Sequence, residues 1–82
     1  MTTAELLQQG VDAAHAGRRR EARELFMRVV EIDPQNEAAW MWLTGLMEDL
    51  DDQIIACENV LAINPANGNV RAKFPSIAAR YS

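Results

Sequence analysis

The side chains that could take part in chemistry are few and lie far apart in the sequence. The chain of 82 residues has one histidine, His15, and one cysteine, Cys57. Four carboxylates lie within residues 48–52, but no nucleophile or base accompanies them, and the sequence has no glycine-rich phosphate loop. Acid–base, nucleophilic and metal chemistry each require several groups at matched spacing. We therefore expect a non-catalytic protein without a cofactor and without a metal ion.

The simplest interpretations of the histidine and the cysteine are structural. Cys57 falls in an apolar stripe with Ile54, Val60 and Leu61, which predicts a small buried hydrophobic side chain rather than a reactive thiol. His15 stands near the end of a predicted helix, where the negative end of the helix dipole tolerates its cationic form. We expect it to be exposed to solvent or to lie at the edge of a binding groove.

Composition and charge narrow the class of protein. Hydrophobic residues make up 49% and charged residues 24% of the chain, as in one small globular domain. The sequence has no run of about 18 apolar residues and begins with a polar segment, so we expect no membrane association and a cytoplasmic location. The net charge of −4 and the lack of aromatic residues beside the arginines argue against nucleic acid as a partner.

The chain is internally repetitive. Residues 22–34, AREL-F-MRVVEIDP, have the same pattern as residues 53–65, QIIA-C-ENVLAINP, and both stretches read as an amphipathic helix that ends at a proline. Leu6 and Trp40 occupy equivalent places before these stretches and are 34 residues apart (40 minus 6). A period of this length is typical of repeats made of two helices.

The sequence resembles the tetratricopeptide repeat (TPR) family, whose pattern is W-x2-L-G-x2-Y, then A-x3-F, then P. The residues that match this pattern are Gly10, Ala22, Phe26 and Pro34 in the first repeat and Trp40, Leu43 and Pro65 in the second. The resemblance implies an all-α helix-turn-helix solenoid of two antiparallel helix pairs and a capping helix. A single TPR-like domain, 1–82, would then contain a first repeat at about 2–34, a second at about 35–65 and the capping helix at about 67–81.

Capping residues and prolines predict where five helices begin and end. The predicted helices run from Thr2 to Gly17, from Arg18 or Arg19 to Asp33, from Asn36 to about Glu48, from Asp51 or Asp52 to Asn64, and from Asn67 to Tyr81. Pro75 removes a backbone donor and clashes with the preceding turn, so we expect a kink near Phe74 or a break into two short helices there.

The resemblance also implies function through a groove lined by the first helix of each pair. A helical projection of the third helix buries Trp40, Leu43, Thr44 and Met47 and turns the other face outward. A similar projection of the first helix, together with the basic residues of the fifth, completes the groove. The predicted protein-binding residues are Leu7, Val11, His15, Ala38, Met41, Trp42, Gly45, Lys73 and Arg80.

The third helix is apolar on all sides, which is unusual for a surface helix. Met41 and Trp42 on its outward face therefore need a cover, for which we consider the fifth helix or the tail of the same chain, a partner protein, or a second copy of the chain. We expect a protein–protein interaction module that binds an apolar or amphipathic peptide or helix. The alternative is self-association, as a homodimer or a helix-swapped oligomer. A ligand recognised by its terminal carboxylate is not expected, because the first two groove-lining helices offer apolar side chains.

Opposite charges mark two of the predicted turns. Arg18, Arg19 and Arg20 lie in the first turn between helices, and the carboxylates of residues 48–52 lie in the equivalent turn of the second repeat. Equivalent turns line up along one edge of a helical repeat, so we expect the two groups to face each other. An acidic edge that attracts a basic partner segment is the alternative.

Overall fold

The structure is a computed structural model that describes residues 1–81. Within this range the chain forms six α-helices and one 3-10 turn, with no strand. The elements are α1 (Thr3–His15), α2 (Arg19–Ile32), α3 (Glu37–Leu46), α4 (Leu50–Ile63), α5 (Gly68–Lys73), α6 (Pro75–Ala78) and η1 (Ala79–Tyr81). The protein is therefore all-α, as predicted.

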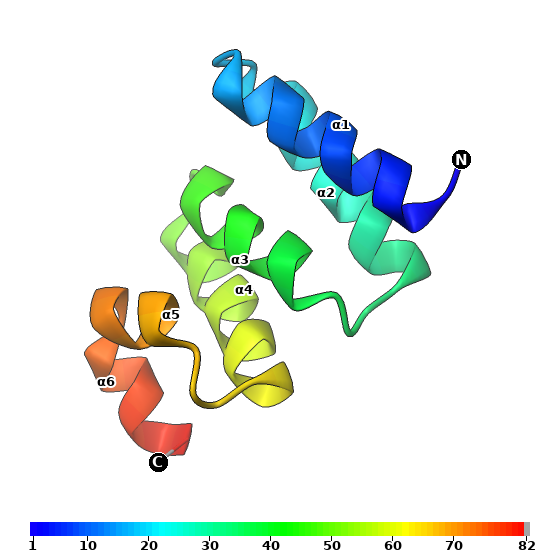
Figure 1. Ribbon diagram of the computed structural model, residues 1–82. Coiled ribbons are helices and arrows are strands. Elements are labelled where there is room, and N and C mark those ends of the chain that lie inside the picture. The colour runs from blue at the N-terminus through cyan, green and yellow to red at the C-terminus, as the bar shows by residue number, and fades with distance from the viewer. Residues whose placement is uncertain (82) are drawn as a thin grey trace.

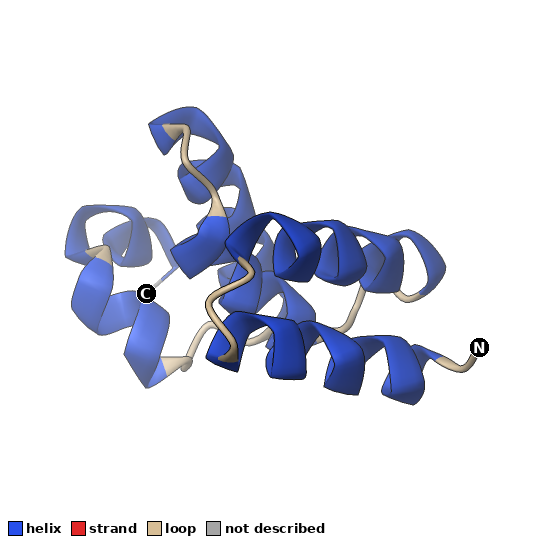
Figure 2. Ribbon diagram, turned by 90° about the horizontal axis from the view of Figure 1, so that it is seen from above, coloured by secondary structure: helices blue, strands red, loops and turns tan. Residues whose placement is uncertain are grey.

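The helices form two consecutive antiparallel pairs, α1 with α2 and α3 with α4, followed by the short helices α5 and α6 (Figure 1). The second pair packs on the first through α2 and α3, and α5 and α6 pack on α4. The N-terminus and the C-terminal helices lie at opposite ends of this row in both views (Figure 2). The molecule extends 36 Å along its longest axis and 22 and 18 Å across it.

Local hydrogen bonds set the ends of α1 as the sequence predicts. The Thr2 hydroxyl accepts a hydrogen bond from the Glu5 amide at 3.1 Å, and a Glu5 carboxylate oxygen accepts from the Thr2 amide at 3.3 Å. This reciprocal pair satisfies two amides that have no partner within the helix. Gly17 follows the helix with a φ of 81°, a left-handed conformation that glycine adopts without steric strain.

The third helix is shorter than predicted. Asn36 caps its start, as expected, by accepting a hydrogen bond from the Ala39 amide at 3.0 Å. Its last residue is Leu46 rather than Glu48, and Met47 is extended. The last carbonyls of a helix have no hydrogen-bond donor within the helix. At the end of α3, side chains of other helices donate to them. One of these side chains is Gln53, whose amide donates to the Met47 carbonyl at 2.7 Å.

The fourth helix begins earlier than predicted. Its capping residue is Asp49, whose carboxylate accepts from the Asp51 amide at 3.0 Å, and not Asp51 or Asp52. The latter two lie in the first helical turn, where their negative charges favour the positive end of the helix dipole. The early start also shortens the turn between α3 and α4 to residues 47–49.

Proline interrupts the C-terminal helix, which confirms the predicted break. Asn67 caps α5 by accepting from the Val70 amide at 3.0 Å. The helix ends at Lys73, and Phe74 has a non-helical backbone with φ −129° and ψ 63°. Pro75 then occupies the first position of α6, where its missing amide costs no hydrogen bond.

The buried face of α3 differs from the predicted one. Leu43 and Thr44 are buried as expected, but the other buried residues are Ala39 and Leu46. Trp40 and Met47 are only half-buried, and the Trp40 indole donates to the Pro34 carbonyl at 2.8 Å. The prediction was wrong because α3 packs against the first pair as well as against α4. Trp40 borders both core clusters, the one between the two helix pairs and the one built on α4, α5 and α6.

Candidate functional site

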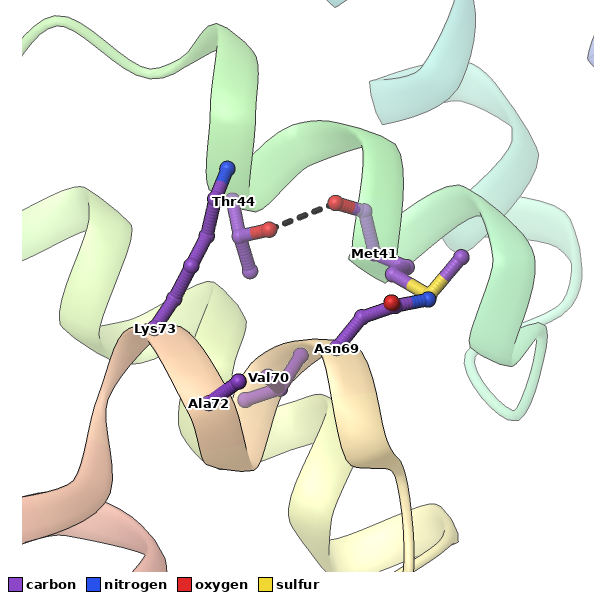
Figure 3. A pocket seen from close by; sticks show the side chains of 6 residues that line it. All are labelled: Met41, Thr44, Asn69, Val70, Ala72 and Lys73. Atoms are coloured by element: carbon purple, nitrogen blue, oxygen red, sulfur yellow. Dashed lines mark hydrogen bonds between the residues drawn. The ribbon is translucent and has the colours of Figure 1, made fainter.

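The clearest concave surface near the predicted site lies between α3 and α5. Two adjacent clefts, of about 340 and 290 Å³, share Met41, Thr44 and Lys73. Figure 3 shows side chains of α3 and α5 facing each other across the larger cleft. We call the two clefts together the α3–α5 groove, which is lined by Met41, Trp42, Thr44, Gly45, Asn69, Val70, Ala72 and Lys73.

Met41 lies at the centre of the groove and lines both clefts. Its backbone carbonyl accepts a hydrogen bond from the Thr44 hydroxyl at 2.5 Å, which satisfies a buried polar side chain within the helix. Its sulfur lies 3.4 Å from the side-chain nitrogen of Asn67 and 3.7 Å from that of Asn69. A flexible thioether at this position adapts to ligand side chains of different shape.

A carboxylate holds the start of α5 against α3. Glu37, in the first turn of α3, accepts hydrogen bonds from the side-chain amides of Asn64 at 3.0 Å and Asn67 at 2.6 Å. Asn67 is buried, and the same side chain caps α5. Hydrogen bonds to an ionised acceptor are stronger than neutral ones. Glu37 therefore fixes the position of α5, and with it the width of the α3–α5 groove.

Trp42 is covered on one face within the chain. Its ring stacks on Phe26 of α2, with centroids 5.6 Å apart and 9° between the planes. The His15 ring meets it edge-on at 5.8 Å. Trp42 is thus covered in part by the first helix pair, and not by the fifth helix, which was one of the covers considered from the sequence. The side chain stays half-buried, and it lines the smaller cleft.

Arginines of α2 bind the end of α3 beside the groove. Arg19 donates to the Gly45 carbonyl at 3.0 Å, and Arg23 donates to the Leu46 carbonyl at 3.2 Å. Arg23 also lies 3.6 Å from the Glu48 carboxylate. These positive charges favour the negative end of the α3 dipole.

Two of the three arginines that were expected to face the acidic turn form ion pairs with glutamates of α2 instead. Arg18 pairs with Glu21 at 3.7 Å, and Arg20 pairs with Glu24 at 3.8 Å, so both ion pairs lie within α2 or at its start. Arg19 binds a backbone carbonyl instead of a carboxylate. The link from α2 to the acidic turn is made by Arg23, which follows the triplet in the sequence.

The structure brings some of the predicted binding residues together and separates others. Met41, Trp42, Gly45 and Lys73 line the α3–α5 groove. Leu7 and Val11 are half-buried on α1 and pack against the core of the first pair, His15 contacts Trp42, and Ala38 is half-buried near the start of α3. Arg80 lies elsewhere, 3.4 Å from the Glu58 carboxylate of α4.

The α5 side of the groove contains lining residues that were not predicted. Asn69 and Ala72 line the larger cleft together with Lys73, but of these three residues only Lys73 was predicted. Ala72 and Lys73 follow Asn69 by three and four residues, so the three residues lie on one helical face. This spacing was the signal that could have found them.

The one cysteine of the chain has a buried thiol. Cys57 is buried, and burial raises the pKa of its thiol above the ordinary value of 9.0, with the Glu58 carboxylate adding to the rise. A thiol held in its neutral form is a poor nucleophile. In residues 1–81 no group of three or more His, Cys, Asp or Glu side chains is arranged to hold a metal ion.

By its fold and its groove, the chain belongs to the class of all-helical proteins that are built of consecutive helix pairs. A partly apolar groove lies between its helices α3 and α5. None of the helices in the described range is long and apolar enough to cross a membrane. We compared the chain with protein-family models, with curated proteins and with solved structures, and none of them matches it.

Proposed function

We propose that this chain is a TPR-like, non-catalytic protein-binding module that takes an apolar or amphipathic helix or peptide in the α3–α5 groove. The observation that carries the proposal is the pair of clefts that share Met41, because half-buried apolar side chains line them beside a single cation. Grooves between helices that are lined in this way suit an amphipathic helix, which places its apolar face inward.

The TPR resemblance supports the same proposal. Two residues of the pattern, Gly10 and Phe26, lie in close contact, since a Cβ at Gly10 would lie 2.8 Å from the nearest Phe26 ring atom. Two positions of the sequence pattern are therefore in direct contact where α1 packs on α2. For the location we propose the cytoplasm, where a free thiol such as that of Cys57 stays reduced.

A titration with a synthetic peptide tests the proposed function. The probe is a fluorescently labelled, N-acetylated and C-amidated alanine-rich helix of about 16 residues, with leucines four positions apart. We expect saturable binding, and we expect Met41→Asp to weaken it at least tenfold, since a carboxylate would enter both clefts. The matched control is Met27→Asp on α2, an exposed methionine that lines neither cleft. Equal affinity of wild type and Met41→Asp would refute the proposal.

Self-association is the second candidate function. It is favoured by two large apolar side chains of α4, Leu50 and Ile55, which are 63% and 52% exposed. Light scattering coupled to size exclusion distinguishes the two functions. A monomer at all accessible concentrations supports a foreign ligand, whereas a dimer that Leu50→Asp converts to a monomer supports self-association.

A further inference from the structure

We infer that the preferred occupant of the α3–α5 groove is an acidic amphipathic helix, whose apolar side chains enter the two clefts and whose carboxylate pairs with Lys73. This inference rests on the proposed function, because it names the class of partner for the same groove.

Lys73 is a cation without a partner among residues 1–81. The sequence has eight Lys and Arg residues. Six arginines bind carboxylates or backbone carbonyls, namely Arg18, Arg19, Arg20, Arg23, Arg71 and Arg80. Within residues 1–81, the structure gives no hydrogen bond or ion pair to the side chains of Lys73 and Arg28. Lys73 lines both clefts of the groove, whereas Arg28 on α2 lines neither.

The one charged side chain in the described lining of the groove is a cation, although the chain as a whole is acidic. Of the eight described residues that line its two clefts, Lys73 alone has a charged side chain. The Glu37 carboxylate, on the same helix as Met41, is occupied by the amides of Asn64 and Asn67. The chain carries a net charge of −4, so Lys73 is the local group in this groove that favours a ligand carboxylate. Charge complementarity of this kind chiefly sets specificity and the rate of association.

The arrangement of the clefts fits the spacing of side chains on a helix. The clefts are adjacent because both are lined by Met41, Thr44 and Lys73. Side chains three or four residues apart on a helix lie on the same face, so two apolar residues of one helix reach the two clefts. A Glu or Asp next to them then lies beside Lys73, which borders both clefts. The walls are helices, so the groove offers no strand edge to an extended peptide.

Two matched peptides and two matched variants test the inference. The acidic peptide is the alanine-rich helix of about 16 residues with two leucines four positions apart and glutamates flanking them, and in the neutral peptide glutamines replace the glutamates. Affinity is measured by fluorescence polarisation for wild type, Lys73→Met and Arg28→Met. Lys73→Met keeps a side chain of similar length and removes the charge. Arg28→Met removes the same charge from a site outside the groove.

We expect wild type to bind the acidic peptide about twofold to fivefold more tightly than the neutral one, as one exposed ion pair allows. Lys73→Met should abolish this preference without weakening the neutral peptide, and Arg28→Met should preserve it. Equal binding of both peptides to wild type would overturn the inference but leave the proposed function intact. Binding of neither peptide would refute the proposed function itself. A concentration-dependent dimer that Lys73→Glu converts to a monomer would assign the groove to a second copy and overturn the inference.

Discussion

The rings of Phe26 and Trp42 lie nearly parallel, with centroids 5.6 Å apart, and they join the first helix pair to the second. Phe26 belongs to the buried core of the first pair, and Trp42 lines the smaller cleft of the α3–α5 groove. One contact therefore links the packing of α2 on α3 to the shape of the binding surface.

Loss of the Trp42 ring should destabilise the whole domain. Trp42→Ala leaves one face of Phe26 uncovered, and we expect it to lower the free energy of unfolding by about 2–3 kcal/mol. Trp42→Phe retains a stacked ring and should cost only about 1 kcal/mol. Urea denaturation followed by circular dichroism measures both variants. Equal stability of Trp42→Ala and wild type would show that the stack does not hold the helix pairs together.

Two glycines should respond in opposite ways to substitution by alanine. A Cβ at Gly10 would lie 2.8 Å from Cε1 of Phe26, so Gly10→Ala forces the ring to move and should destabilise the protein by about 1–3 kcal/mol. A Cβ at Gly45 meets nothing within 4 Å, so Gly45→Ala should stabilise α3 by about 0.5–1 kcal/mol. Thermal and urea unfolding of the pair give the sign directly. A stabilising Gly10→Ala would contradict the close packing of α1 on α2.

Removal of the Glu37 carboxylate should loosen α5. Glu37→Ala deprives the amides of Asn64 and Asn67 of their acceptor, and we expect a loss of about 1–3 kcal/mol. Hydrogen exchange should show the largest increase at the amides of α5, such as that of Val70. Glu31→Ala, at an exposed position on α2, is the matched control and should change neither quantity. Unchanged exchange in α5 after Glu37→Ala would rule out this role for the carboxylate.

The buried thiol predicts a dependence on pH. The pKa of Cys57 is raised in the folded state, so folding favours the neutral thiol. This contribution to stability is fully present below the unfolded pKa, at about pH 9, and is lost as the pH rises through the folded pKa. Wild type should therefore lose stability above about pH 9 more steeply than Cys57→Ala. Alkylation by iodoacetamide at about pH 8 should be slower for the folded than for the unfolded chain.

Helix ends could be predicted from the sequence because their causes are local. The capping box of Thr2 and Glu5 and the break at Pro75 each depend on residues within one or two turns. The end of α3 was predicted too late because Arg19 and Arg23, which are more than 20 residues away, bind its last carbonyls. Such contacts depend on how the helix pairs stack, which no local pattern encodes.

The candidate site could be predicted only in part for the same reason. Met41 and Lys73, which were predicted as groove residues, line the α3–α5 groove, and each lies on the outward side of its own helix. The stacking of Trp42 on Phe26 was not predicted, since it depends on the angle at which α3 crosses α2. Arg80 was predicted in the groove as a basic residue of the C-terminal helix, but it follows the break at Pro75 and lies 3.4 Å from the Glu58 carboxylate of α4.

Two-dimensional NMR of the ¹⁵N-labelled chain, titrated with the acidic peptide, shows whether the α3–α5 groove binds a helix. The two indole N–H signals provide an internal comparison, because Trp42 lines the groove and the Trp40 indole is bonded to the Pro34 carbonyl. We predict that the Trp42 indole and the amides of Met41, Thr44 and Lys73 shift with a common saturation curve, while the Trp40 indole stays in place. A second cleft lies between α1 and α2 and includes Asp12 and Glu21. Shifts confined to that cleft, or no shifts at all, would show that the α3–α5 groove does not bind the peptide.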